Sequence, residues 1–260
     1  MRIKYILSKD TRSESFSNLI KEKYPEFLTE KDPEVILVSG GDGAFLHAVQ
    51  KFNSPGVSFL GRAAGTLNFF MNKFSDDEEF LKLLLQQKLD LRHLSTNGIR
   101  VEIRKKGKEN IEVGNAINEI VIGADIMGYY NFSISSEDSS FNKFKVKGTG
   151  ICISTDMGST GYNFNLGGVI VPLGSGFWSL RGIATNRYIN DILKIQEIEI
   201  SCLSLGTKPW IFIDGIRSKV KIEQDDKIVL TKGENIEIIF LEDSDFAKKR
   251  IEIMSRYRKD

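Results

Sequence analysis

Three glycines surround one acidic residue in Gly40-Gly41-Asp42-Gly43, a composition that points to phosphate chemistry. Glycines let the backbone approach an anion closely, and a helix that begins here supplies unpaired N–H donors and a partial positive charge. Because a carboxylate repels phosphate, Asp42 fits such a loop only if it binds a metal or accepts a proton from a hydroxyl that attacks phosphorus. The alternative is a tight turn in which Asp42 makes an Asx-type hydrogen bond.

The flanking residues place this loop between a strand and a helix. Residues 35–39 form a nearly continuous apolar run, as a strand buried on both faces requires, and apolar residues recur at helical spacing over residues 44–52. In open α/β sheets, ligands bind at the carboxyl ends of the strands. Residues 61–70 are rich in small side chains and follow a second expected strand at residues 57–60. We therefore expect the two loops to face each other across one crevice.

An acidic residue interrupts the apolar run of residues 116–122, where Asn118 precedes Glu119. A buried carboxylate is unfavourable without hydrogen-bond partners. The pair is suited to a nucleoside, because Glu119 can accept hydrogen bonds from ribose hydroxyls while the Asn118 amide contacts a base edge. The alternative is a strand residue that faces solvent beside a paired Asn.

A loop rich in hydroxyl groups and glycine, residues 155–163, follows an expected strand at residues 151–154. Its hydroxyls, its backbone amides and one aromatic side chain are suited to holding a nucleotide. The alternative is a long capped loop that leads into a helix.

Strands and helices alternate in the first half of the chain, which predicts a parallel sheet with helices on both faces. The expected elements are strands at residues 4–7, 35–39 and 57–60 and helices at residues 13–23, 44–52 and 76–87. Short runs rich in β-branched residues follow from about Leu91 and predict an all-β segment. Its expected strands are residues 99–104, 111–122, 131–135, 141–146, 151–154, 195–203, 210–213, 219–222, 228–230 and 235–241.

Two features stand out within this β-rich segment. Residues 176–190 are compatible with one helix, and Asp214-Gly215 joins two β runs as a hairpin turn. The change of pattern predicts an α/β N-terminal domain at residues 1–95 and a β-rich domain at residues 96–241.

The composition is that of a globular protein, with 260 residues, a hydrophobic fraction of 41% and a net charge of +1. This charge argues against nucleic-acid binding, and the basic stretches at residues 248–250 and 256–259 are expected to form a solvated end. No apolar run approaches the ~20 residues of a membrane span, and the first ten residues contain no signal core. Cys152 and Cys202 lie in apolar segments, as expected for buried thiols of a cytoplasmic protein.

Four stretches, taken in order, resemble the NAD kinase family in its compact bacterial form. They are Gly40-Gly-Asp-Gly43, Leu67-Asn-Phe69, Asn118-Glu119, and the block from Ser154 through Gly158-Ser-Thr-Gly-Tyr162 to Gly167-Gly168. The resemblance covers nearly the whole chain, and the last block is its most specific part. It implies a two-domain fold that binds NAD between the domains, with residues 242–260 returning to the first domain. The implied reaction is phosphorylation of the 2′-hydroxyl of the adenosine ribose of NAD, which makes NADP.

The resemblance also implies residue roles. Asp42 matches the group taken to activate the 2′-hydroxyl, Gly41 and Gly43 match glycines that meet phosphates, and Asn118 and Glu119 match the pair that binds adenosine. Further nucleotide-site positions that match the family are Phe69, Thr160, Gly161 and Tyr162. Candidate contacts on the nicotinamide side are Lys147, Thr149, Asp156 and Met157.

Cofactors and assembly follow from the same resemblance. It implies ATP or polyphosphate as the phosphoryl donor, a divalent metal that is usually magnesium, and a homodimer or homotetramer whose sites include residues of a neighbouring subunit. The chain departs from the family pattern in the last block. Asp156 and Met157 stand where relatives usually have Pro and Thr or Ser, and Thr149 stands where they usually have Asp.

Two other functions stay open at this point. The segment at residues 65–68 resembles the GTxN segment of diacylglycerol-type lipid kinases, although Phe69-Phe70 follow it in place of the usual Asp-Phe. The second alternative is a kinase-like protein that binds a dinucleotide without turnover. A Rossmann oxidoreductase is disfavoured because the loop lacks the G-x-G-x-x-G spacing. His47 and His93 are expected to be structural histidines.

Overall fold

A computed structural model describes residues 1–64, 69–123, 128–136, 143–203, 209–223 and 225–242, together with Glu252 and Ser255. The chain forms two compact units, one of Met1–Ser95 with Asn235–Asp260 and one of Thr96–Glu234. The segment at residues 65–68 and the predicted return of residues 243–260, with its basic stretches, lie outside the described residues apart from Glu252 and Ser255.

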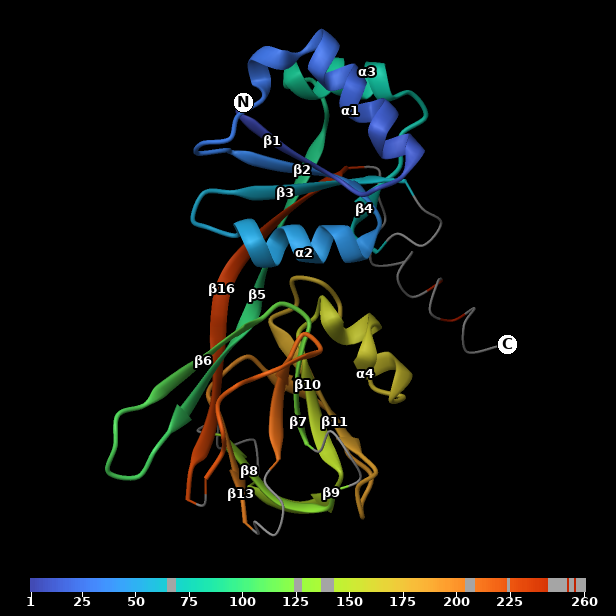
Figure 1. Ribbon diagram of the computed structural model, residues 1–260. Coiled ribbons are helices and arrows are strands. Elements are labelled where there is room, and N and C mark those ends of the chain that lie inside the picture. Colours follow the sequence, from blue (N-terminus) through green and yellow to red (C-terminus); the bar gives the residue numbers. More distant parts are fainter. Residues whose placement is uncertain are drawn as a thin grey trace. The chain divides into compact units, whose positions relative to one another are not determined.

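A parallel sheet in the order β1, β2, β3 and the end of β16 forms the framework of the first unit (Figure 1). Every residue of β2 is buried, which explains its continuous apolar sequence. The predicted parallel sheet is therefore confirmed. The strands are β1 (Ile3–Leu7), β2 (Val35–Gly40), β3 (Ser58–Ala63), the short β4 (Met71–Asn72) and β16 (Lys227–Leu241).

Helices α1 and α3 cover one face of this sheet and α2 covers the other (Figure 1). The rings of Phe16 in α1 and Phe80 in α3 stack with centroids 6.4 Å apart, while Phe45 in α2 packs against Phe59 of β3 at 6.1 Å. These contacts bury the apolar stripe of each helix against the strands. The helices are α1 (Thr11–Lys23), the 3₁₀ turn η1 (Pro25–Phe27), α2 (Asp42–Phe52) and α3 (Asp77–Leu85).

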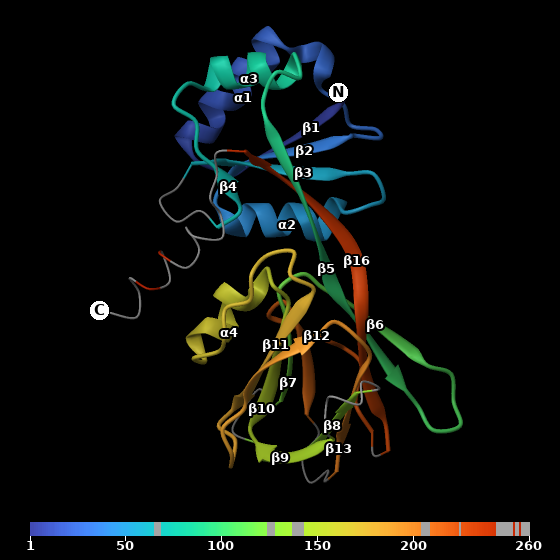
Figure 2. The same ribbon diagram turned by 180° about the vertical axis from the view of Figure 1, so that it is seen from behind.

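Two antiparallel sheets form the second unit (Figure 2). One has the order β12, β11, β10, β7, β14, β15, and in the other β9, β8, β13 and β16 pair in sequence, with β5 beside β16 and β6 beside β5. The strands and short helices of this half are β5 (Leu91–Arg104), β6 (Ile111–Ala116), β7 (Glu119–Gly123), β8 (Tyr130–Ser136), β9 (Phe144–Gly148), β10 (Gly150–Ser154), η2 (Gly158–Thr160), α4 (Tyr162–Asn165), β11 (Phe177–Ile183), β12 (Asn190–Lys194), β13 (Ile198–Cys202), β14 (Trp210–Ile213) and β15 (Ile216–Arg217).

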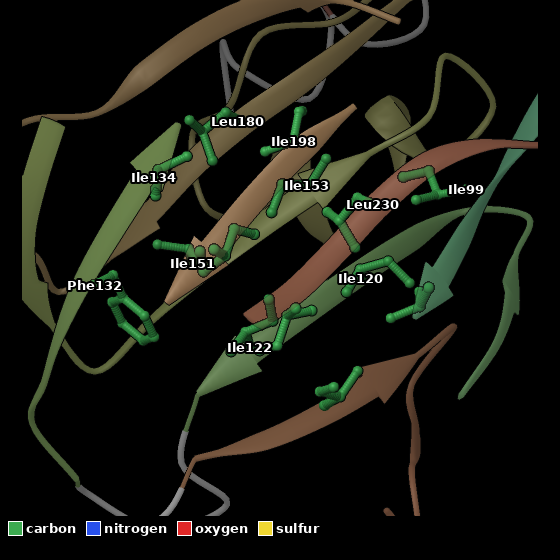
Figure 3. Close-up of a cluster of buried hydrophobic side chains, with 14 of the residues drawn as sticks. Ile99, Ile120, Ile122, Phe132, Ile134, Ile151, Ile153, Leu180, Ile198 and Leu230 are labelled. Atoms are coloured by element: carbon green, nitrogen blue, oxygen red, sulfur yellow. The ribbon is translucent and has the colours of Figure 1, made fainter. Parts of the chain in front are cut away.

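Alternate residues of the six-stranded sheet point into one apolar core. The core side chains drawn in Figure 3 include Ile120, Ile122, Ile151, Ile153 and Leu180. The intervening residues point to the opposite face, where the register places Glu119 beside Ser154 and Ser154 beside Ser179. The same strands thus supply a rigid core on one face and a row of polar side chains on the other.

The predicted helix at residues 176–190 is wrong. Trp178 and Leu180 enter the core while Ser179 and Arg181 take the opposite face, so the period is that of a strand, β11. Two other strand predictions also need correction. Residues 219–222 form no strand, and the expected run at residues 111–122 breaks into β6 and β7. The runs at residues 228–230 and 235–241 belong to one strand, β16.

The predicted buried thiols are confirmed. Cys152 and Cys202 are free and buried, and burial raises the pKa of each to about 12. None of the described helices combines the length and the apolar character that a membrane crossing requires.

The core of the second unit can be tested with a matched pair of isoleucines. Ile153 is fully buried, so Ile153→Ala should lower the free energy of unfolding by about 3 kcal/mol through lost burial and a residual cavity. Ile192 on β12 is 51% exposed, and Ile192→Ala should change it by less than about 1 kcal/mol. Urea unfolding followed by circular dichroism measures both; equal losses would contradict the assignment of the core.

Candidate functional site

Asp42 is the first residue of α2, directly after β2, with Gly41 as the N-cap. The helix was predicted to begin at Ala44, so it begins two residues earlier than expected. This start places Asp42 at the positive end of the helix dipole, which stabilises a negative charge on its side chain. The loop therefore lies at the carboxyl edge of the parallel sheet, as predicted.

The Asp42 carboxylate joins this loop to the one that follows β3. It accepts hydrogen bonds from the backbone N–H of Phe69 at 3.0 and 2.9 Å and from that of Phe70 at 2.9 Å. The two loops therefore meet, as predicted, and their contact is a carboxylate bound to backbone amides. These bonds fix the orientation of the side chain.

The glycines of the loop divide into two kinds. A Cβ atom on Gly40 would lie 2.8 Å from Ser8 Oγ, so this glycine is required for close packing against the segment after β1. A Cβ atom on Gly41 or Gly43 would meet no described residue within 4 Å. The two glycines that flank Asp42 thus have no described neighbour at these positions, as a cradle for a ligand requires.

A buried arginine supports the strand ends from which both loops leave. Arg62 in β3 is only 8% exposed; it donates to Ser39 Oγ at 3.3 Å and pairs with both carboxylate oxygens of Asp77 at 3.1 and 2.6 Å. Its guanidinium also lies 4.8 Å from the ring centroid of Phe16. Arg62 thus connects the ends of β2 and β3 to α3. The sequence did not predict this role, because Arg62 stands in a stretch of small residues with no nearby acidic partner.

In the second unit, Asp214 creates the break between β6 and β7. Its carboxylate accepts hydrogen bonds from three consecutive backbone N–H groups, those of Ile117 at 2.8 Å, Asn118 at 2.7 Å and Glu119 at 3.0 Å. The predicted hairpin turn is confirmed, with positive φ at Asp214 and Gly215. The same turn therefore holds the Asn118-Glu119 pair in place.

The Asn118-Glu119 pair presents two unsatisfied acceptors. Glu119 is 9% exposed, and its Oε2 and the Oδ1 of Asn118 make no hydrogen bond within the described part of the chain. Burial, with a smaller contribution from the nearby charge of Asp214, raises the pKa of Glu119 to about 7. Buried polar atoms of this kind normally have partners, so this pair is suited to a ligand that donates hydrogen bonds.

The glycine- and hydroxyl-rich loop packs directly on this pair. Thr155 Oγ1 donates to the carbonyl of Ile117 at 2.7 Å, and a side chain at Gly158 would overlap the backbone of Asn118. A Cβ atom on Gly161 would lie 3.8 Å from Glu119 Oε2, the unsatisfied acceptor. The structure thus brings together two of the predicted stretches, Asn118-Glu119 and the loop at residues 155–161.

The remaining predicted site residues fall into four groups. Thr160, Gly161 and Tyr162 lead into α4 and are partly or fully exposed beside the pair. Asp156 and Met157 are 3% and 1% exposed, so their side chains contact the interior of the unit. Lys147 lies in β9, and Thr149 precedes β10 at the end opposite to Ser154, which places Thr149 about 17 Å along that strand from Glu119. Phe69 belongs to the first unit, and His47 and His93 are exposed.

Comparison with known proteins identifies the family. No family model matches the chain. The NAD kinase of Rickettsia canadensis is 30% identical over 186 residues, which cover 72% of this chain and 70% of that protein. The chain belongs to the NAD kinase family. NAD kinase 1 of Oceanobacillus iheyensis is 32% identical over 66% of this chain, and NAD kinase of Finegoldia magna is 30% identical over 56%. The chain spans 65% and 53% of the lengths of these two relatives.

Solved structures share the NAD kinase fold. Yeast NADH kinase complexed with NADH superposes with a TM-score of 0.78 and 18% identity over 100% of this chain and 89% of that one. An NAD kinase from Archaeoglobus fulgidus in complex with ATP has a TM-score of 0.68 and 18% identity over 98% and 99%. The resemblance and the two-domain fold predicted from the sequence motifs are therefore confirmed.

A resident metal centre is not formed by the described residues of this NAD kinase family member. No three His, Cys, Asp or Glu side chains gather among them in a way that could hold a metal ion. Asp42 is the carboxylate of the glycine loop, and Mg²⁺ commonly uses one or two carboxylates together with substrate phosphates. The single carboxylate of Asp42 therefore fits a metal that is held mainly by ligand phosphates.

The raised pKa of Glu119 predicts a pH-dependent stability. Between the ordinary value of 4.5 and about 7, the folded protein keeps a proton that the unfolded chain has released, so stability falls as pH rises through this window. Glu119→Gln removes this dependence and should stabilise the protein by about 3 kcal/mol at pH 8, with no difference near pH 4. Thermal unfolding at both pH values measures the effect. The exposed Glu112 on β6 provides the control, because Glu112→Gln should change the free energy of unfolding by less than about 1 kcal/mol at either pH. Identical profiles for Glu119→Gln and the unaltered protein would contradict the assignment.

Proposed function

We propose that this protein transfers a phosphoryl group from ATP to the 2′-hydroxyl of the adenosine ribose of NAD and so makes NADP. Membership of the NAD kinase family supports the proposal, as do the NADH and ATP named with the two solved structures. The single observation that carries it is the pair of buried, unsatisfied acceptors, Glu119 Oε2 and Asn118 Oδ1.

The chemistry of an adenosine group matches this pair. The ribose presents O–H donors and the adenine presents an N–H₂ donor, so one nucleoside can satisfy a carboxylate and an amide oxygen together. Binding relieves the penalty of two unpaired buried acceptors, which makes the site selective for a ligand with donors at both positions. Because Glu119 has a pKa of about 7, its carboxylate is more than half ionised only above that pH, so hydroxyl binding should strengthen as the pH rises through that value.

Asp42 is the proposed general base. The backbone N–H groups of Phe69 and Phe70 hold its carboxylate in one orientation. In this assignment the carboxylate accepts the proton of the 2′-hydroxyl as the hydroxyl oxygen attacks the terminal phosphorus of the donor, while the bond from that phosphorus to the bridging oxygen breaks and ADP leaves. The transition state of phosphoryl transfer is loose, so positioning and charge neutralisation supply most of the acceleration. Among the described residues, nothing lies within 4 Å of a Cβ position on Gly41 or Gly43, which leaves room beside Asp42 for phosphate oxygens.

The donor, metal and assembly complete the proposal. Magnesium bound to the donor phosphates would neutralise their charge. Polyphosphate is the alternative to ATP as the phosphoryl donor. The family resemblance also supports a homodimer or homotetramer in the cytoplasm. Light scattering on the purified protein measures the assembly.

One assay tests the function directly. The purified protein is incubated with NAD, magnesium and either ATP or polyphosphate, and NADP is detected with a dehydrogenase that requires it. NADP formation is expected, and the donor that supports it identifies the phosphoryl source. Absence of NADP with both donors, from protein that is folded by circular dichroism, would overturn the proposal. Parallel incubation with diacylglycerol distinguishes a lipid kinase by its phosphatidate product.

Replacement of the proposed base should separate turnover from folding. Asp42→Asn keeps an oxygen that can accept from the backbone N–H groups but removes the basic carboxylate, so kcat should fall by about 10² to 10⁴. Asp76→Asn is the matched control, because Asp76 also accepts two backbone N–H groups at a helix start in the same unit. It should leave kcat unchanged. Steady-state kinetics measures both variants, and near-normal turnover in Asp42→Asn would remove Asp42 from the base role.

A further inference from the structure

The loop that packs on Asn118 is anchored there by its first residue. The N–H of Thr155 donates to the carbonyl of Asn118 at 2.8 Å, and its Oγ1 donates to the carbonyl of Ile117 at 2.7 Å. Thr155 Oγ1 also accepts from the N–H of Gly158 at 3.0 Å. One side of the loop is therefore fixed to the proposed adenosine site.

The next residue anchors the loop on its other side. Asp156 is 3% exposed, and its two carboxylate oxygens accept from different segments: Oδ1 from Thr96 Oγ1 at 2.6 Å and Oδ2 from the N–H of Gly174 at 2.6 Å. Thr96 belongs to β5, and Gly174 belongs to the segment that returns from α4 toward β11. One buried carboxylate therefore connects the loop to two stretches that lie far from it in sequence.

Ser159 reinforces the same connection. Its hydroxyl donates to the carbonyl of Asp156 at 3.0 Å and accepts from the N–H of Val171 at 3.0 Å. The returning segment is thus held to the loop at two points. Val171 bonds to Ser159, and Gly174 bonds to Asp156. Loss of the Asp156 carboxylate would remove the bonds to Gly174 and Thr96 and leave the returning segment held to the loop through Ser159.

We propose that Asp156 is a positioning residue that holds the loop of residues 155–161 against Asn118 and Glu119 through Thr96 and Gly174. The proposal rests on the proposed function, because it makes acceptor binding depend on this buried carboxylate. It differs from the expectation that Asp156 contacts the nicotinamide half of the ligand, since the side chain is enclosed by its own unit. It assigns Asp156 no contact with reacting atoms.

Three variants separate this role from simple stability. Asp156→Ala removes both hydrogen bonds, and Thr96→Val removes one while leaving Asp156 in place. Asp156→Asn is the conservative variant: its amide oxygen can accept from Gly174 and its N–H₂ can donate to the Thr96 hydroxyl, which is also an acceptor. Asp156→Ala should raise the KM for NAD about tenfold with kcat within about twofold, Thr96→Val should raise KM by less, and Asp156→Asn should restore KM.

Asp226 provides the matched control. It is a buried aspartate of the same unit, 6% exposed, and it also accepts one side-chain and one backbone hydrogen bond, from Lys105 at 3.1 Å and from the N–H of Glu223 at 2.8 Å. Asp226→Ala should lower the melting temperature but leave the KM for NAD unchanged. All kinetics are measured well below the melting temperature of each variant.

Hydrogen–deuterium exchange gives a second readout that does not depend on activity. Backbone amides of residues 155–161 should exchange faster in Asp156→Ala and Thr96→Val than in the unaltered protein or Asp156→Asn. Unchanged exchange and KM in both variants would overturn the positioning role, as would an equal rise in KM in Asp226→Ala. If the unaltered protein makes no NADP, the proposed function fails, and the exchange measurement still decides whether Asp156 holds the loop.

Discussion

Three successive backbone N–H groups converge on the single carboxylate of Asp214, and the β-rich unit depends on this interaction for its polar site. Without an acceptor at this point, the apolar run from β6 to β7 would favour one continuous strand. The carboxylate interrupts the run at Asn118 and satisfies the amides that the interruption exposes. A negative charge near Glu119 also makes ionisation of that side chain harder. Asp214 therefore sets the geometry of the pair and adds to the larger effect of burial on the pKa of Glu119.

The six-stranded sheet makes that geometry rigid. Along each strand, residues alternate between the apolar core and a polar face. Glu119, Ser154 and Ser179 therefore form one row on the polar face, and the closely packed core lies on the opposite face. Ser179 donates to Asn163 of α4 at 2.6 Å, which ties the short helix to the same row. A site built on strands with such support is held more accurately than one built on free loops. Packing on one face and recognition on the other are thus consequences of the same two-residue period.

The sequence was most informative where local pattern decides structure. The strands and helices of the first unit followed from apolar periodicity, and Asp42 and the Asn118-Glu119 pair were found from residue type and spacing. Residues 176–190 were misread because the apolar Trp178 and Leu180 do not by themselves distinguish a strand from a helix. The contacts of Asp214 span 95 to 97 residues, and those of Asp156 reach Thr96 across 60. No local pattern encodes such partners, so these roles required the fold.

The buried thiols bear on how this fold withstands oxidants. Peroxide attacks the thiolate form of cysteine, and the pKa values of about 12 keep Cys152 and Cys202 protonated at neutral pH. Both side chains are also shielded from solvent by their strands. NADP is the precursor of the reductant that cells use against peroxide. A protein proposed to make NADP would thus contain no readily oxidised cysteine within its described residues.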